Sequence, residues 1–244
     1  MKQEVNIGCS SFNNAYWKSI FYPEELPKSK WFDFYCTHFG TYEMNGTFYK
    51  PPTVKSMDNW YHKVPGDFLF SVKAPKDITH IKKMSGCEGL IEDFYTACRL
   101  GLREKLGCIL FQFPPGYQYS PDKLEDILKN LDPNFENVLE FRHNSWWIPE
   151  VWNELSNHNI TFCSVSYPGL PDTVFTEAPL VYLRLHGKPE LFYSAYSHEE
   201  LSYLKNLICS SKKSKKAFVY FNNTASQAGI LNALEVKALL TPLT

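Results

Sequence analysis

The chain has 244 residues, of which 44% are hydrophobic and 21% are charged, and its formal net charge is −1. The length fits one barrel of about 250 residues, and the composition is typical of a globular domain with a sizeable core. The near-zero charge gives no global electrostatic reason to expect binding to nucleic acid or to a membrane surface, and no apolar run approaches the ~20 residues that span a bilayer.

Eight short apolar runs follow one another along the chain, and nearly every one ends in a polar or charged side chain. The runs are Val5–Cys9, Thr41–Met44, Phe68–Val72, Gly107–Phe111, Asn137–Phe141, Thr161–Val165, Leu180–Leu185 and Lys216–Phe221. The connections between them are long enough to cross over, as parallel strands require. The pattern predicts an α/β fold with eight parallel strands, a TIM-like (β/α)8 barrel forming a single domain over residues 1–244.

Helical patterns fill most of the connections. The predicted helices are Pro27–Phe39, Thr53–His62, Leu90–Lys105, Pro121–Leu131, Ile148–His158, Ser197–Ile208 and Ser226–Leu240. Thr53 and Ser120 are expected N-caps, and Ser197 with Glu200 forms a capping box. The connection over residues 167–179 holds three prolines. We therefore expect an irregular loop there, between the sixth and seventh strands, and about seven helices in all.

The seven cysteines contain no C-x-x-C pair, so the common zinc and thioredoxin-like patterns are absent. Their odd number, with several inside expected strands or helices, favours a reducing cytoplasm. The first expected strand begins at Val5, and no secretory signal precedes it. We therefore expect a cytoplasmic protein.

Strand parity places polar side chains on the inward side of the predicted barrel, because residues i and i+2 share one side of a strand. Three strands carry such sets at their carboxyl ends: Thr41, Glu43 and Asn45; Val138, Glu140 and Arg142; Tyr182, Arg184 and His186. An unpaired buried charge is costly, so three matching sets at one end indicate a functional site. In a (β/α)8 barrel that end is the active-site face.

Residue chemistry gives each candidate a role. The catalytic candidates are Glu43, Lys73, Glu140 and His186. The two glutamates are a candidate acid and base, His186 can move a proton near neutral pH, and Lys73 is either an amine nucleophile or an anion contact. The substrate-binding candidates are Asn45, Tyr49, Gln112, Arg142, Trp146, Arg184, Asn222 and Asn223. The arginines suit bidentate contacts to a carboxylate or phosphate.

The same residues can instead have purely structural roles. The charged residues can form a balanced network that seals the barrel top, and the aromatic residues near the strand ends can pack the loops instead of stacking on a ligand. Lys212, Lys213, Lys215 and Lys216 fit a solvated loop better than a nucleic-acid patch. No metal and no cofactor are expected, because the histidines lack ligand spacing and the arginines would oppose a divalent cation.

The strand ends resemble the YecE-like family, also called domain of unknown function 72, from about Ile7 to the C-terminus. The matching stretches are Ile7–Ser11, Phe21–Glu24, Tyr42–Tyr49, Phe70–Pro75 with Ile78–His80, Leu110–Pro115, Glu140–Trp146, Tyr182–Gly187 and Tyr220–Asn223. The resemblance implies a TIM-like barrel with distant likeness to sugar-isomerase-like barrels, and it implies no established reaction. Departures from the family pattern are Gly46 in place of serine, Ser164 and Ser166 where an aspartate is frequent, and Thr224 where aspartate is common.

These observations predict a metal-independent enzyme that acts on a small anionic hydroxylated compound, such as a sugar phosphate or sugar acid. The expected chemistry is proton transfer of the isomerase or lyase type. Two alternatives remain: a nucleic-acid-binding or endonuclease-like barrel, for which fold analogy is a weak warrant, and a non-catalytic anion-binding module. No membrane partner is expected.

Overall fold

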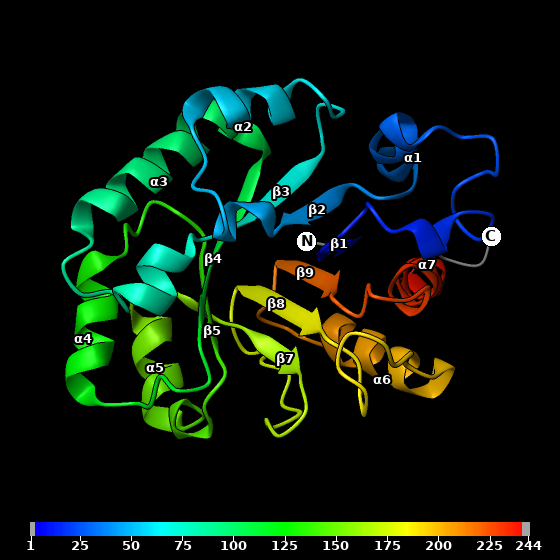
Figure 1. Cartoon of the computed structure of the whole chain (residues 1–244). Helices are drawn as coiled ribbons and strands as arrows, with labels where there is room; N and C mark the ends of the chain where they lie inside the picture. Colours follow the sequence, from blue (N-terminus) through cyan, green and yellow to red (C-terminus); the bar gives the residue numbers. More distant parts are fainter. Residues whose placement is uncertain (1–2, 241–244) are drawn as a thin grey trace. The chain divides into compact units, whose positions relative to one another are not determined.

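The computed structural model describes residues 3–240, which form a mixed α/β fold built on parallel strands (Figure 1). The strands are β1 Glu4–Cys9, β2 Thr41–Met44, β3 Leu69–Lys73, β4 Leu106–Phe113, β5 Asn137–Phe141, β6 Thr161–Phe162, β7 Ser164–Ser166, β8 Leu180–Leu185 and β9 Lys216–Phe221. They form a four-stranded sheet in the order β1-β9-β8-β7 and a five-stranded sheet in the order β2-β3-β4-β5-β6.

The predicted helices are confirmed within a few residues at each end. They are α1 Trp31–His38, α2 Val54–Tyr61, α3 Glu88–Leu102, α4 Pro121–Asn130, α5 Pro149–Asn157, α6 His198–Cys209 and α7 Ala228–Leu240. The Thr53 and Ser120 side chains cap α2 and α4, and Ser197 and Glu200 form the expected capping box of α6. Residues 167–179 contain no helix or strand, as the prolines predicted.

The strand count differs from the prediction at one place. The apolar run Thr161–Val165 is divided at Cys163 into β6 and β7. The Cys163 amide donates to the Leu139 carbonyl at 2.8 Å, which continues the pairing of β6 with β5, whereas β7 pairs with β8. An apolar run does not reveal a change of pairing partner, so the sequence predicted one strand. A closed eight-stranded barrel stays a prediction.

The chain divides into two compact units, the first comprising residues 1–43 and 164–244 and the second residues 44–163. The predicted single domain over residues 1–244 stays a prediction, and its residues 1–2 and 241–244 lie outside the described part. In the first unit, the parallel register aligns Cys9 with Phe221 and Phe221 with Leu185. The carboxyl ends of β1, β9 and β8 therefore meet at one edge of the four-stranded sheet.

The second unit aligns the ends of β3, β4 and β5 in the same way. Lys73 pairs with Leu110, and Gln112 pairs with Glu140. Helices α2 and α3 pack closely in this unit, because Gly101 of α3 lets the two backbones approach. A Cβ atom at Gly101 would lie 2.2 Å from the Met57 Cβ. No helix between residues 3 and 240 combines the length and the apolar character needed to cross a bilayer.

Candidate functional site

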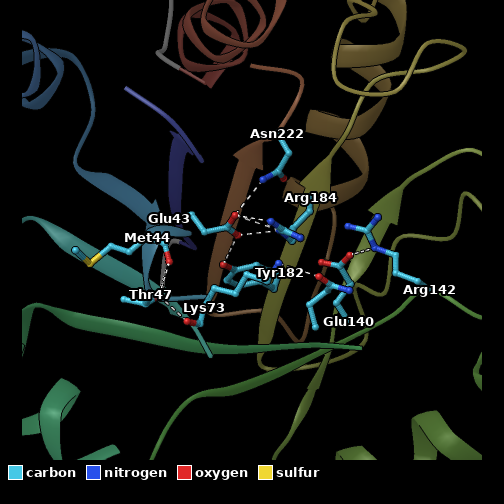
Figure 2. Close-up of polar contacts among 10 residues, drawn as sticks. Glu43, Met44, Thr47, Lys73, Glu140, Arg142, Tyr182, Arg184 and Asn222 are labelled. Atoms are coloured by element: carbon cyan, nitrogen blue, oxygen red, sulfur yellow. Dashed lines mark hydrogen bonds and ion pairs between the residues drawn. The ribbon is translucent and has the colours of Figure 1, made fainter. Parts of the chain in front are cut away.

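The first unit holds a buried ionic cluster, the Glu43 cluster, formed by Glu43, Tyr182, Arg184 and Asn222 (Figure 2). The Arg184 guanidinium donates two hydrogen bonds to the Glu43 carboxylate, from Nη2 to Oε1 at 2.7 Å and from Nε to Oε2 at 2.9 Å. The Tyr182 hydroxyl donates to Oε2 at 2.8 Å, and the Asn222 amide donates to Oε1 at 3.0 Å. Both Tyr182 and Arg184 reach Glu43, so they share one side of β8, as the parity argument predicted.

The electrostatics of Glu43 favour an orienting role. Burial acts to raise the pKa of the carboxyl, but Arg184 and the donated hydrogen bonds outweigh it and hold that pKa below its ordinary value. A fully buried carboxylate that already accepts from three side chains is a poor proton acceptor. Its contacts instead fix the Arg184 side chain, which is only 3% exposed. The catalytic assignment of Glu43 stays a prediction.

Two further candidates of the first unit lie just past the strands that carry the Glu43 cluster. His186 directly follows β8, and Asn223 lies two residues after the end of β9. His186 is buried, and its ring lies edge-on to Tyr167 and Phe192. The Asn223 amide donates to the Ser194 carbonyl at 2.9 Å, which ties the end of β9 to the loop after β8. Within residues 3–240, the Oδ1 atoms of Asn222 and Asn223 are buried without a hydrogen-bond partner. Such buried acceptors can take a ligand hydroxyl or an ordered water.

The second unit holds a group of residues, which we call the cationic cluster, in which the cations Lys73 and Arg142 act on the imidazole of His80. Lys73 ends β3, and its ammonium group donates to the Gln112 Oε1 at 2.8 Å while lying 4.1 Å from the centre of the Phe48 ring. Phe48 also contacts His80, with ring centres 4.8 Å apart. The Phe48 ring therefore contacts both the ammonium group and the imidazole.

A threonine fixes the backbone around Lys73. The Thr47 hydroxyl is within donating distance of the Lys73 carbonyl, at 2.6 Å, and of the Met44 carbonyl, at 3.1 Å (Figure 2). Thr47 belongs to the short 3-10 helix Gly46–Phe48, so this contact also positions Phe48. The local sequence after β2 thus sets the wall against which the Lys73 side chain lies.

Arg142 follows β5 and forms an ion pair with Glu140 (Figure 2). Glu140 is fully buried, and the Arg142 side chain is 9% exposed. Two residues apart on one strand, they share a side, as parity predicted. A carboxylate held in this pair orients the guanidinium more readily than it exchanges protons with a substrate, so its contacts, like those of Glu43, favour positioning over catalysis.

His80 is not among the catalytic or substrate-binding candidates that the sequence analysis singled out. It lies in a single π-helical turn, Asp77–Ile81, and such turns occur frequently at functional sites. Burial, followed by the charges of Lys73, Arg142 and Lys83, lowers its pKa to about 4. The half-buried imidazole is therefore neutral at pH 7 while facing several cations. The sequence signal that could have identified His80 as a site residue is its position shortly after the third predicted strand.

The family model "Protein of unknown function DUF72" matches residues 6–243. The chain belongs to the DUF72 family. It is similar to the UPF0759 protein YunF of Bacillus subtilis, with 24% identity over 90% of this chain and 89% of YunF. It is also 29% identical to the UPF0759 protein YecE of Escherichia coli K12, over 45% of this chain and 40% of YecE.

Solved structures agree with this assignment and confirm the predicted resemblance. A DUF72 family protein of Thermotoga maritima, TM1631, superposes with a TM-score of 0.86 and 31% identity over 98% of this chain and 99% of that one. A DUF72 family protein of Enterococcus faecalis, EF0366, shares the fold with a TM-score of 0.82 at 20% identity, over 98% and 96% of the two chains.

Three of the four positions where this DUF72 chain departs from the expected pattern take part in hydrogen bonds that involve loops of the first unit. The Ser164 hydroxyl accepts from the Phe175 amide at 2.9 Å, which holds the helix-free loop after β7. The Ser166 hydroxyl accepts from the Tyr196 hydroxyl at 2.9 Å, and the Thr224 carbonyl accepts from the Asn14 side chain. These residues fix loops of the first unit.

The aromatic candidates divide into two kinds. Trp146 is fully buried, stacked 4.0 Å from Phe141, and its indole nitrogen donates to the Tyr117 carbonyl at 2.6 Å. These contacts favour the packing alternative over a ligand wall. Tyr49 is 75% exposed and therefore accessible, and Asn45, at the start of the 3-10 helix, is half-buried.

Across the described residues, no three or more His, Cys, Asp and Glu side chains lie together as a metal site requires. Among the predicted residues, the structure groups Glu43 with Arg184 and Asn222 in one unit, and Lys73 with Gln112 and Glu140 with Arg142 in the other.

Proposed function

We propose that this DUF72 protein is an enzyme that acts, without a metal ion, on a small anionic hydroxylated compound such as a sugar phosphate or sugar acid. The proposed chemistry is proton transfer of the isomerase or lyase type, at the carboxyl ends of the strands in the second unit. One observation carries the proposal: burial, together with the charges of Lys73 and Arg142, lowers the pKa of the half-buried imidazole of His80 to about 4.

A local excess of positive charge around a neutral histidine is the environment that an anionic group complements. Arg142 is held by Glu140, so its guanidinium is oriented before a ligand arrives. Arginine suits planar, bidentate recognition of a carboxylate or phosphate, and Lys73 adds a compact point charge. The Gln112 amide that accepts from Lys73 holds the ammonium group in place.

Ligand binding then tunes the proton-transfer group. A bound anion offsets the cationic charges that lower the pKa of His80, so that pKa rises toward neutrality when the site is occupied. A general acid or base works best when its pKa is near the operating pH. His80 would therefore become an efficient proton carrier in the complex, while Lys73 and Arg142 hold the anionic group. His186 stays a predicted proton-transfer residue.

We propose as well that the strands of this chain close into an eight-stranded barrel. The resemblance of the strand-end motifs supports a closed eight-stranded barrel and a relation to sugar-isomerase-like barrels. The experimental crystal structure of a ligand complex of this chain would test both.

Solvent deuterium exchange tests the chemistry directly. The protein is incubated in D2O with a panel of sugar phosphates and sugar acids, and proton NMR follows the loss of carbon-bound hydrogen signals. The proposal predicts exchange or isomerisation of at least one compound, with the rate reduced at least about 100-fold in His80→Asn, as loss of general acid–base catalysis implies. The Arg142→Met variant should raise KM, because it removes an anion contact.

The matched control is Lys63→Met, which removes an exposed cation that lies 4.8 Å from the Trp60 ring. It should leave the rate unchanged. Binding of an anionic sugar without exchange would support the non-catalytic binding module instead. An unchanged rate in His80→Asn would refute the role of the imidazole.

A further inference from the structure

The first unit contains a concave site, which we call the tyrosine pocket. Its volume is about 720 Å³, and its walls include Tyr16, Ile20, Tyr193, Gln227, Leu231 and Asn232. Small-molecule sites commonly occupy about 300–1,000 Å³. The pocket is formed by the loops that follow β1, β8 and β9 and by the first turns of α7, so it lies beyond the strand ends of the four-stranded sheet.

Hydrogen bonds tie these three loops together. The Asn14 side chain accepts from the Tyr16 amide and donates to the Thr224 carbonyl, which joins the first loop to the third. The Trp17 indole donates to the Ser226 carbonyl at 2.9 Å. The Ser226 hydroxyl in turn donates to the Tyr193 carbonyl at 3.0 Å. Both tyrosines are therefore carried on fixed backbone.

The floor of the pocket is equally constrained. The Asn232 side chain accepts from the Tyr196 amide at 2.9 Å and donates to the Tyr196 carbonyl at 3.0 Å. Its amide group is thus locked by the loop after β8. A pocket whose backbone and floor are fixed before binding loses little conformational entropy when a ligand binds.

The tyrosine rings themselves are exposed. Tyr16 is 72% exposed and Tyr193 is 52% exposed, and Ile20 and Leu231 beside them are also exposed. Within residues 3–240, neither tyrosine hydroxyl makes a hydrogen bond. Two exposed rings on fixed loops offer flat apolar faces with free polar tips, which suits amphipathic ring ligands.

The charge of the lining narrows the ligand class. Among the described residues 3–240, no Asp, Glu, Lys, Arg or His side chain lines the pocket, and the polar side-chain groups that do are hydroxyls and amides. This contrasts with the cationic cluster of Lys73, His80 and Arg142 in the second unit. An uncharged ligand with an apolar ring face and several hydroxyl groups matches the walls, whereas a charged one would lose hydration without gaining an ionic partner.

We propose that the tyrosine pocket binds an uncharged saccharide through stacking of its rings on Tyr16 and Tyr193 and hydrogen bonds to Gln227 and the tyrosine hydroxyls. The volume accommodates more than one sugar ring. The residues of this site differ from those of the anion site proposed above, and the inference does not depend on the reaction assigned to that site.

Ligand-observed NMR of the full chain tests the inference. The probes are neutral disaccharides (maltose, cellobiose and lactose), with adenosine and uridine as flat-ring comparisons. We expect saturable binding of at least one disaccharide, weakened roughly threefold to tenfold by Tyr16→Ala and by Tyr193→Ala, since an aromatic stacking contact contributes about that factor. Tyr16→Phe should retain most of the affinity, because it keeps the ring face.

The matched control is Tyr203→Ala, because Tyr203 is 66% exposed and lies outside the pocket. It should leave binding unchanged. Three results would overturn the inference: no saturable binding of any disaccharide, equal binding by both tyrosine variants and the native chain, or preference for the nucleosides. Thermal unfolding of each variant verifies that the chain remains folded.

Discussion

Replacing Glu43 by glutamine is the sharpest perturbation of the first unit. The substitution keeps the size of the side chain but removes the charge that compensates Arg184, which is 3% exposed and forms ion contacts at 2.7 and 2.9 Å. Loss of one partner of a buried ion pair commonly costs about 3–5 kcal/mol, because the other charge is left uncompensated. We expect the free energy of unfolding to fall by about that amount in Glu43→Gln.

A double-mutant cycle assigns the effect to the pair. Arg184→Met should also be strongly destabilising, and the double variant should lose about 2–3 kcal/mol less than the sum of the two singles. Urea denaturation followed by circular dichroism measures all four proteins. The exposed pair of Arg103 and Asp58 is the control, since Asp58→Asn should cost no more than about 1 kcal/mol. A Glu43→Gln protein within 1 kcal/mol of the native chain would refute the reasoning.

The pH dependence of the same cluster has a definite sign. The pKa of Glu43 in the folded chain is held below the ordinary value of 4.5. Its ionised form therefore stabilises the fold fully above about pH 4.5, and this stabilisation is lost as the pH falls through the folded pKa. Glu43→Gln should lack this component of the acid sensitivity, measured as the slope of unfolding free energy against pH.

Three further predictions concern other elements. Gly101→Ala should destabilise the chain by about 1–3 kcal/mol, because the new Cβ would lie 2.2 Å from the Met57 Cβ. Gly89→Ala on the same helix is the control: its Cβ would meet no atom within 4 Å, so the substitution should be neutral or stabilising by up to about 1 kcal/mol. Ser197→Ala should cost about 1 kcal/mol by removing the cap of α6. The pKa of His80 is lowered to about 4, so its neutral form stabilises the fold above about pH 6.5, and this stabilisation is lost as the pH falls toward 4. Allowing for the partial exposure of the imidazole, we expect the free energy of unfolding to fall by about 1–2 kcal/mol over this range. His80→Asn should lack this change. Thermal and urea unfolding check all three, and equal stability of Gly101→Ala and Gly89→Ala would contradict the packing argument.

Local rules predicted much of the fold from the sequence. Helix caps and proline positions are set by nearby residues, so the capping box at Ser197 and the helix-free segment over residues 167–179 were predictable. Strand parity is equally local, and it correctly placed Tyr182 and Arg184 on one side of β8. Both residues contact Glu43.

Pairing partners and loop geometry could not be predicted in the same way. The division of Thr161–Val165 at Cys163 depends on which strand each half pairs with, and hydrophobicity carries no such information. The pocket beside Tyr16 depends on loop conformations fixed by long-range hydrogen bonds. Hydrophobic periodicity also does not predict that His80 lies in a π-helical turn. The chemistry-bearing residues missed by sequence reasoning lie in these loops.

The pKa of His80 with and without a bound anion tests the central claim most directly. Histidine-labelled protein is titrated by NMR in the free state and with a saturating concentration of the anionic sugar that binds tightest in the panel. The account predicts a pKa of about 4 in the free protein and a rise toward neutrality in the complex, with Arg142→Met raising the free value. A pKa that is already near 6.5 in the free protein, or that does not change when the anion is bound, would contradict the account.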